Sequence, residues 1–456
     1  MKLKLFTYLF VIALFGSACT KEYAPASLDK IRLAWNDDPA TTITIGWDQF
    51  GGESPVVYYD TKDLGQNWKR YEHSQKPTRE LSHMKMNTRF CELGGLLPNT
   101  AYYFVIKDSE GVSERFWFKT APDKPSPFTC IMGGDTKSIE PALNAGRFSN
   151  EMVAKLRPLF VIYCGDFTTG DGTDPDNWAL WLTDWFELTR TPDGRLIPIV
   201  PVHGNHEKGV PEILNSIFNA PYQNDNPENI YYSLSIGEDF FHMILLNSEL
   251  DEGGEQRQWM KEDLEKNSDF TFKLAANHKP FRPHTMRKRE NNYQYRQWAY
   301  LFYEHGLDIF LDADSHMSKI TYPIKPDSIN GHEGFIRDDL NGTMHIGEGS
   351  WGASPRVADD NKPWTLRSGS FNQIKWLQVF PKTESDPARI DIRTVITSTR
   401  DSLDQAVSHV EGVASLSEED VFAVPQGIDL FSTEPYGDVI SYPFVDRNQG
   451  EQVEAQ

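Results

Sequence analysis

The segment Gly204-Asn205-His206-Glu207 places an amide, an imidazole and a carboxylate directly after an apolar run, where a buried strand would end. Open α/β sheets bind their ligands at the carboxyl ends of such strands. Taken alone, the segment is also typical of a helix cap or a turn. Similar motifs follow four other apolar runs: Gly134-Asp135, Gly165-Asp166, Asn277-His278 and Asp314-Ser315-His316. Together they predict one convergent cluster of oxygen and imidazole metal ligands.

A cluster of this composition suits the hydrolysis of a phosphoric ester. The reaction needs an activated water, neutralisation of charge on the phosphoryl oxygens and stabilisation of the leaving oxygen. Two metal ions about 3.5–4 Å apart supply all three, with a metal-bound hydroxide attacking in line. A carboxylate is the natural bridge between two such cations. The sequence therefore indicates a dinuclear metal site.

Short apolar segments must position these motifs as buried strands. They cover residues 128–132, 159–163, 196–202, 272–276 and 307–311. The spacing of apolar residues also predicts helices over 178–189, 257–266 and 294–305. We therefore expect an α/β domain over residues 128–400.

The order Asp, Gly-Asp, Gly-Asn-His-Glu, His and a final His motif resembles the calcineurin-like metallophosphoesterases, and among them the purple acid phosphatases. A strand pair expected at 231–234 and 241–249 and a helix from Gln256 are similar to the same family, and the resemblance covers roughly residues 28–355. It implies a β-sandwich flanked by helices. It also implies a metal-dependent hydrolase of small-molecule phosphoesters, either a phosphomonoesterase or a phosphodiesterase. The alternative is a degenerate member of the fold that acts as a cell-surface binding protein.

The resemblance also implies a role for each motif residue. It assigns Asp166 as the bridge, Asp135 and His316 to metal 1, and Asn205 and His278 to metal 2. His206 would contact the phosphate or the leaving oxygen, and Glu207 would orient it.

The chain departs from the family pattern at three positions. Thr169 stands where the purple enzymes have a tyrosine ligand, so we expect no iron(III)-tyrosinate colour. Lys137 replaces a His or Gly found in many relatives and would hold a phosphate oxygen as a point charge. Asp314 replaces the first imidazole of the last motif, and is either a metal-2 ligand or an acceptor for His278. Two divalent ions of manganese, zinc or ferrous iron are expected, with metal 1 held by few protein ligands.

A cluster of positive charge follows His278. We expect Arg282 to bind a phosphate oxygen and His284 to be a possible proton donor to the leaving group, because prolines on either side restrict this loop. The alternative is a solvated loop, which is the favoured interpretation for residues 287–289.

Residues 28–121 predict a separate all-β sandwich. Tyr102 is placed like the tyrosine corner of fibronectin type III domains, and purple acid phosphatases similar to this chain carry such a domain ahead of the catalytic one. A proline-rich linker follows at 122–127. Residues 401–456 are expected to form a C-terminal extension, in which residues 415–419 would cap a short helix.

The chain opens with a charged and then apolar stretch typical of a signal peptide over residues 1–18. Gly16-Ser17-Ala18-Cys19 resembles a bacterial lipobox, which would make Cys19 the lipidation site and residues 19–27 a tether; ordinary cleavage near Ala18 is the alternative. We expect an exported protein, lipid-anchored to the outer membrane, the cell surface or the periplasmic face. The formal net charge of −21 argues against a nucleic-acid partner. The oligomeric state stays open.

Overall fold

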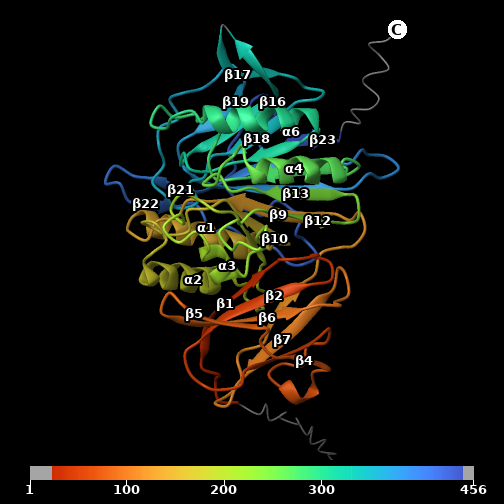
Figure 1. The fold of residues 1–456 in the computed structure, drawn as a ribbon. Helices are drawn as coiled ribbons and strands as arrows, with labels where there is room; N and C mark the ends of the chain where they lie inside the picture. Colours follow the sequence, from red (N-terminus) through yellow and green to blue (C-terminus); the bar gives the residue numbers. More distant parts are fainter. Residues whose placement is uncertain (1–22, 330, 445–456) are drawn as a thin grey trace, which may run out of the picture.

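The computed structural model describes residues 23–329 and 331–444. The predicted signal peptide, Cys19 and the start of the tether lie outside the described residues, as does the polar end of the C-terminal extension from residue 445 onwards. In Figure 1 an all-β region, coloured red to orange, forms one end of the molecule, and the α/β region stacks above it. No helix of the described ranges combines the length and apolar character that crossing a membrane requires.

The N-terminal region folds as two facing sheets. One contains β1 Leu28–Ala34, β2 Ile43–Gln49, β5 Arg79–His83 and β6 Met86–Leu93. The other contains β3 Val56–Asp60, β4 His73–Gln75, β7 Ala101–Lys107 and β8 Phe116–Lys119, with the short helix η1 Trp68–Arg70. Trp47 and Phe104 are fully buried between them. The Tyr102 hydroxyl accepts a hydrogen bond of 2.9 Å from the Leu97 amide, which confirms the tyrosine corner.

The first sheet of the α/β region continues the N-terminal sheet. Its further strands are β9 Phe128–Gly133, β10 Phe160–Tyr163, β11 Ile199–Pro201, β20 Asn372–Phe380, β21 Arg389–Arg400, β22 Ala406–Ser408 and β23 Ile440–Pro443. Its order is β22-β21-β20-β9-β10-β11-β1-β2-β6-β5, with β23 paired to β21. The junction is a parallel pairing in which Ala34 of β1 lies opposite Ile199 of β11. The two regions therefore share a sheet as well as the linker at 122–127.

The second sheet has the order β12-β13-β14-β15-β18-β16-β17, with β19 paired to β16. Its strands are β12 Tyr232–Ile236, β13 Phe241–Leu245, β14 Phe272–Ala276, β15 Ile309–Leu311, β16 Ser318–Ile329, β17 His332–Arg337, β18 Thr343–Gly347 and β19 Thr365–Gly369. It packs on the first sheet through apolar side chains; the rings of Phe128 and Phe241, for example, meet edge to face at 5.1 Å.

Helices cover the outer faces of this sandwich (Figure 1). They are α1 Ala142–Leu156, α2 Pro175–Thr189, α3 Ile213–Phe218, α4 Glu255–Lys266, α5 Asn292–Gln294, η2 Tyr295–Ala299 and α6 Tyr300–Glu304. Because both faces of β9 and β10 are covered, these strands are buried along their whole length and apolar apart from Thr129. The predicted sandwich with flanking helices is confirmed.

The C-terminal segment returns to the body of the molecule. Residues 415–419 are not helical, so the predicted short helix is wrong. The amide of Leu416 donates to the Lys155 carbonyl at 2.8 Å, and the carboxylate of Glu418 pairs with Arg157 and Arg195. The backbone amide of Leu416 and the side chain of Glu418 thus bind partners outside the segment, which holds it in an irregular path instead of a helix.

Candidate metal centre

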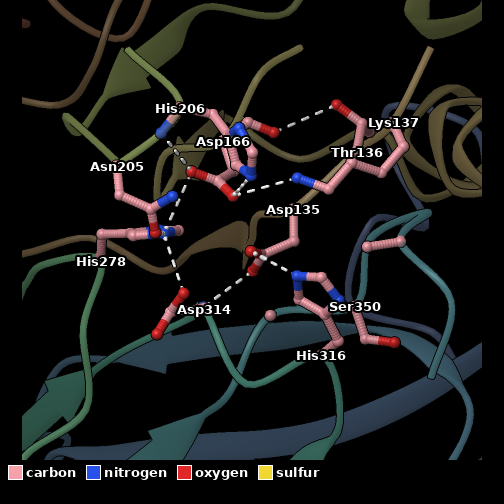
Figure 2. A network of polar contacts seen from close by, with 12 residues as sticks. Asp135, Thr136, Lys137, Asp166, Asn205, His206, His278, Asp314, His316 and Ser350 are labelled. Atoms are coloured by element: carbon pink, nitrogen blue, oxygen red, sulfur yellow. Dashed lines mark hydrogen bonds and ion pairs between the residues drawn. The ribbon is translucent and has the colours of Figure 1, made fainter. Parts of the chain in front are cut away.

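The predicted ligands lie in the loops that follow β9, β10, β11, β14 and β15, and Figure 2 shows them facing one another. Several adopt left-handed backbone conformations: φ is 68° at Asp135, 57° at Asp166, 64° at Asp314 and 54° at His316. Residues other than glycine seldom adopt this conformation, and such residues cluster at functional sites. The backbone is held in turns that aim these side chains into one place.

One group of ligands consists of Asp135, Asp166 and His316, all of them buried. One ligand atom from each lies within 4.8 Å of the others. His316 Nε2 is 3.2 Å from Asp135 Oδ1. The other oxygen of Asp135 accepts a hydrogen bond of 2.9 Å from the Asp314 amide. The backbone at residue 349 can lie this close to the Asp135 carboxylate only because the residue is Gly349; a Cβ at that position would collide with the carboxylate.

A second group surrounds His278 Nε2. This atom lies 3.1 Å from Asp166 Oδ1, 3.2 Å from Asn205 Oδ1 and 3.7 Å from Asp314 Oδ1. The amide atom of Asn205 that faces His278 also lies 3.1 Å from Asp314 Oδ1. The Nδ1 atom of His278 donates to the Cys164 carbonyl at 2.7 Å, which fixes the ring so that Nε2 faces the group. Asp166 belongs to both groups, as a bridging ligand must.

These atoms fit divalent metal ions. Ligands bound to one ion at about 2.1 Å are separated by about 3.0–3.5 Å, close to most of the distances observed here. Asn205 presents either its oxygen or, with the amide turned over, its nitrogen to His278 and Asp314. With the oxygen inward, carboxylate, amide and imidazole ligands converge on one place, as a divalent cation requires. Asp135 and His316 would hold metal 1, Asn205, His278 and Asp314 metal 2, and Asp166 both.

The charged groups of the cluster strongly shift one another's pKa values. Burial alone would raise the pKa of Asp166, but His278, Lys137 and His206 outweigh it and hold that pKa well below its usual value. Burial likewise lowers the pKa of His278, but the carboxylates of Asp166, Asp135 and Asp314 raise it to about 10. In the absence of metal, a proton on His278 therefore supplies the positive charge of this group.

Two lysines flank the carboxylates. Lys137 Nζ lies 3.1 Å from Asp166 Oδ2, and Lys288 Nζ contacts Asp314 Oδ1. The contact of Lys288 was missed by sequence reasoning, which favoured a solvated loop for residues 287–289. Arg356 was missed as well: its Nη1 donates to the Asp314 carbonyl and its amide to the His316 carbonyl, each at 2.8 Å. The only sequence signal for Lys288 is its position in the basic run that follows the ligand His278.

His206 lies at the edge of the cluster, with its Nε2 3.4 Å from Asp166 Oδ2 and its side chain 30% exposed. Its amide donates to Asp166 Oδ1 at 2.9 Å. Glu207 does not orient this ring. Its buried carboxylate accepts hydrogen bonds of 2.9 Å from the amides of Asp166, Phe167 and Gly204. Glu207 therefore ties the loops after β10 and β11 together.

The structure does not bring Arg282 and His284 to the cluster. Arg282 is buried, donates to the Phe281 and Glu333 carbonyls, and lies over the ring of Tyr295 at 4.2 Å. His284 Nδ1 is 3.1 Å from Glu348 Oε1, and its Nε2 is 2.7 Å from Thr365 Oγ1. The loop turns inward because Phe281 packs in the core of the second sheet. These contacts give both residues structural roles in place of the predicted phosphate-binding and proton-transfer roles.

Comparison with known families agrees with this geometry. Residues 133–318 match the calcineurin-like phosphoesterase family, and residues 28–120 match the purple acid phosphatase N-terminal domain. Residues 133–318 are thus similar to the calcineurin-like phosphoesterases. With the N-terminal match ahead of them, the chain is similar in domain order to the purple acid phosphatases.

Among curated relatives, the chain is 28% identical over 238 residues to probable purple acid phosphatase 20 of Arabidopsis thaliana, covering 49% of this chain and 51% of that protein. It is 25% identical over 303 residues to purple acid phosphatase 18 of the same plant, covering 61% and 62%. The chain thus spans about half to three-fifths of the length of these relatives.

Two solved structures share the fold. The purple acid phosphatase PPD1 from yellow lupin (Lupinus luteus) seeds has a TM-score of 0.65 at 17% identity, covering 90% of this chain and 78% of that chain. The structure of PhoD has a TM-score of 0.60 at 11% identity, covering 84% of this chain and 90% of that chain.

Proposed function

We propose that this protein is a metal-dependent phosphoric ester hydrolase with a dinuclear site, acting on phosphomonoesters or phosphodiesters. The observation that carries the proposal is the convergence of two ligand groups on Asp166, from strand ends of both sheets. A degenerate binding protein would not need to keep donor atoms at such separations. The match of residues 133–318 to the calcineurin-like phosphoesterases and the fold of the solved neighbours support the same activity class.

When bound, two divalent ions would supply an activated water and neutralise charge on the phosphoryl group. The chain's own residues prepare the place for that group. Asp166 is held by its neighbours on both oxygens, while His206 stays partly exposed beside it and can donate to a phosphate or leaving oxygen. Lys137 adds a point charge at 3.1 Å from Asp166. Together these residues bind and orient an anionic ester.

We propose manganese, zinc or ferrous iron for both ions, and no purple colour. The family's tyrosine position is Thr169, whose hydroxyl accepts a hydrogen bond of 2.8 Å from the Ser138 amide. A threonine hydroxyl stays protonated near neutral pH and supplies no phenolate to stabilise ferric iron. Oxygen ligands with two imidazoles suit the divalent ions named above.

We also propose that residues 28–121 and 128–400 are the two domains of the exported protein, and that Cys19 is lipidated. Metabolic labelling with a radioactive fatty acid tests the anchor. Label should enter the wild-type protein and be absent from Cys19→Ser.

The proposed activity is tested by metal content together with turnover. The purified protein should carry about two metal ions per chain and hydrolyse 4-nitrophenyl phosphate or bis(4-nitrophenyl) phosphate. Asp166→Ala should lose both metals and the activity, because both groups share that carboxylate. Asp171→Ala, which changes an exposed aspartate of the same loop, is the matched control and should keep both. Metal-loaded protein that hydrolyses neither ester would overturn the proposal.

A further inference from the structure

A pocket of about 370 Å³ adjoins the metal-1 group. Lys137 and His316 line it; His316 belongs to the metal-1 group, and Lys137 contacts Asp166 of the same group. Figure 2 shows these two side chains on the same side of Asp135. An ester whose phosphoryl group sits at the cluster can therefore place its alcohol part in this pocket.

The pocket is basic in an acidic molecule. Arg287 and Arg356 line it together with Lys137, against a single carboxylate, Glu140, whose charge acts on Arg400. Arg287 is exposed and makes no ion pair with a carboxylate in residues 23–329 and 331–444. The chain as a whole has a formal net charge of −21. Unpaired positive charge at this place favours an anion.

Arg356 is the more rigid of the two arginines. Its Nη1 donates to the Asp314 carbonyl at 2.8 Å, which ties the guanidinium to the ligand loop while its remaining N–H groups make no other hydrogen bond within the described ranges. A guanidinium with free N–H groups binds carboxylate or phosphate oxygens strongly. Holding it in place beforehand reduces the entropy lost on binding.

The rim of the pocket is apolar. Ile139 and Val357 line it and are 64% and 65% exposed, respectively. Large apolar side chains exposed to this degree beside a charged pocket suit a ligand with a carbon frame. The pocket therefore has two complementary parts, an apolar rim and a basic wall.

We propose that this pocket is a second anion subsite, which selects phosphoesters whose alcohol part carries a further carboxylate or phosphate on a carbon frame. The inference rests on the proposed hydrolase function and narrows its substrate class. Arg287 is the residue that contacts the second anion, with Arg356 beside it. The phosphoryl group itself stays with Lys137, His206 and the metal ligands.

Matched substrates test the subsite. Phenyl phosphates with a carboxylate at the meta or para position are compared with the corresponding carboxamides, which are similar in shape and neutral. For the wild-type protein, kcat/KM should be about tenfold higher for the carboxylate, the size of one hydrogen bond between charged groups. Arg287→Gln should bring this ratio close to one. Arg289→Gln, an exposed residue of the same loop outside the pocket, is the control and should keep the ratio and both rates.

Equilibrium binding separates failure of the subsite from failure of the hydrolase. Benzylphosphonates with the same carboxylate or carboxamide groups cannot be hydrolysed, and their affinity is measured by calorimetry on the metal-loaded protein. The carboxylate should bind about tenfold more tightly, and Arg287→Gln should remove the difference. Equal affinities would overturn the subsite even if the esters are hydrolysed. A retained difference without hydrolysis of any ester would overturn the proposed activity and keep the anion site.

Discussion

Asp166 distributes its two oxygens between different partners. Its Oδ1 faces the His206 amide and the His278 ring, while its Oδ2 faces Lys137 and the His206 ring. A fully buried carboxylate stays ionised only with such compensation. The same arrangement explains why one carboxylate can serve both ligand groups without moving.

Asp314 is one of the three positions at which the chain departs from the purple acid phosphatase pattern, and its role can be tested directly. Its Oδ1 lies 3.7 Å from His278 Nε2 and contacts Lys288 Nζ. If it is a metal-2 ligand, Asp314→Ala should leave about one metal ion per chain, whereas Asp314→His should restore two. Elemental analysis after gel filtration measures this, with Asp171→Ala again as the control. Two ions in Asp314→Ala would leave Asp314 only as the partner of Lys288 and His278.

The convergence of the candidate metal ligands could be predicted from the sequence because each is local to one strand end. An apolar run and the polar residues after it are adjacent in the chain, so the sequence alone places those polar residues at the end of a strand. Arg282, His284 and Lys288 depend instead on the path of a loop. That path is set by Phe281, whose ring stacks on Phe310 at 4.7 Å, a contact between residues distant in sequence.

At the scale of elements, the loop that carries Asp314 and His316 rests on a buried ionic network. Lys319 of β16 pairs with Asp312 at 2.5 Å and with Glu348 at 3.0 Å, and Glu348 also contacts His284. Every one of these side chains is buried. The network joins the ends of β15, β16 and β18 and thereby supports the ligand loop from below.

Glu348→Gln should destabilise the protein by about 3 kcal/mol at pH 7, because it leaves the buried Lys319 with less compensation. Burial raises the pKa of Glu348, but Lys319 and His284 outweigh it and lower the pKa to about 2. A lowered carboxylate pKa stabilises the fold above its unfolded value of about 4.3 and loses that contribution as pH falls toward 2. The difference between wild type and variant should therefore shrink below about pH 4. Denaturant unfolding at several pH values measures it, and a difference independent of pH would contradict this account.

Periodicity predicted the strands that end at the site and the helices α2 and α4, because their apolar residues face a core over many positions. It did not reveal that β1 pairs with β11. Parallel pairing between separate regions leaves no mark on either strand, since the paired residues, Ala34 and Ile199, are simply apolar. The prediction of a helix at residue 415 was wrong for a similar reason: Glu418 pairs with Arg157 and Arg195, which lie far away in the sequence.

At the scale of the whole molecule, Arg195 connects three parts of the chain. Its buried guanidinium donates to the carbonyls of Arg157 and Pro158, pairs with Glu418 of the C-terminal segment, and lies over the ring of Trp117 from the N-terminal domain at 5.4 Å. Next to it the backbones of Trp117 and Arg195 form a parallel bridge. Together with the shared sheet, this junction makes separate unfolding of the two domains costly.

We therefore expect the wild-type protein to unfold in a single calorimetric transition, although it contains two domains. Arg195→Met should lower the free energy of unfolding by about 3–5 kcal/mol, because it leaves two buried carbonyl groups without their partner and leaves Glu418 with only Arg157. It should also separate the transition of the N-terminal domain from that of the rest. Arg296→Met is the matched control: this exposed residue pairs with Glu333 away from the junction, so the loss should stay below about 1 kcal/mol. A single transition in Arg195→Met would show that the shared sheet, and not this arginine, couples the domains. Two transitions in the wild type would show that neither of them does.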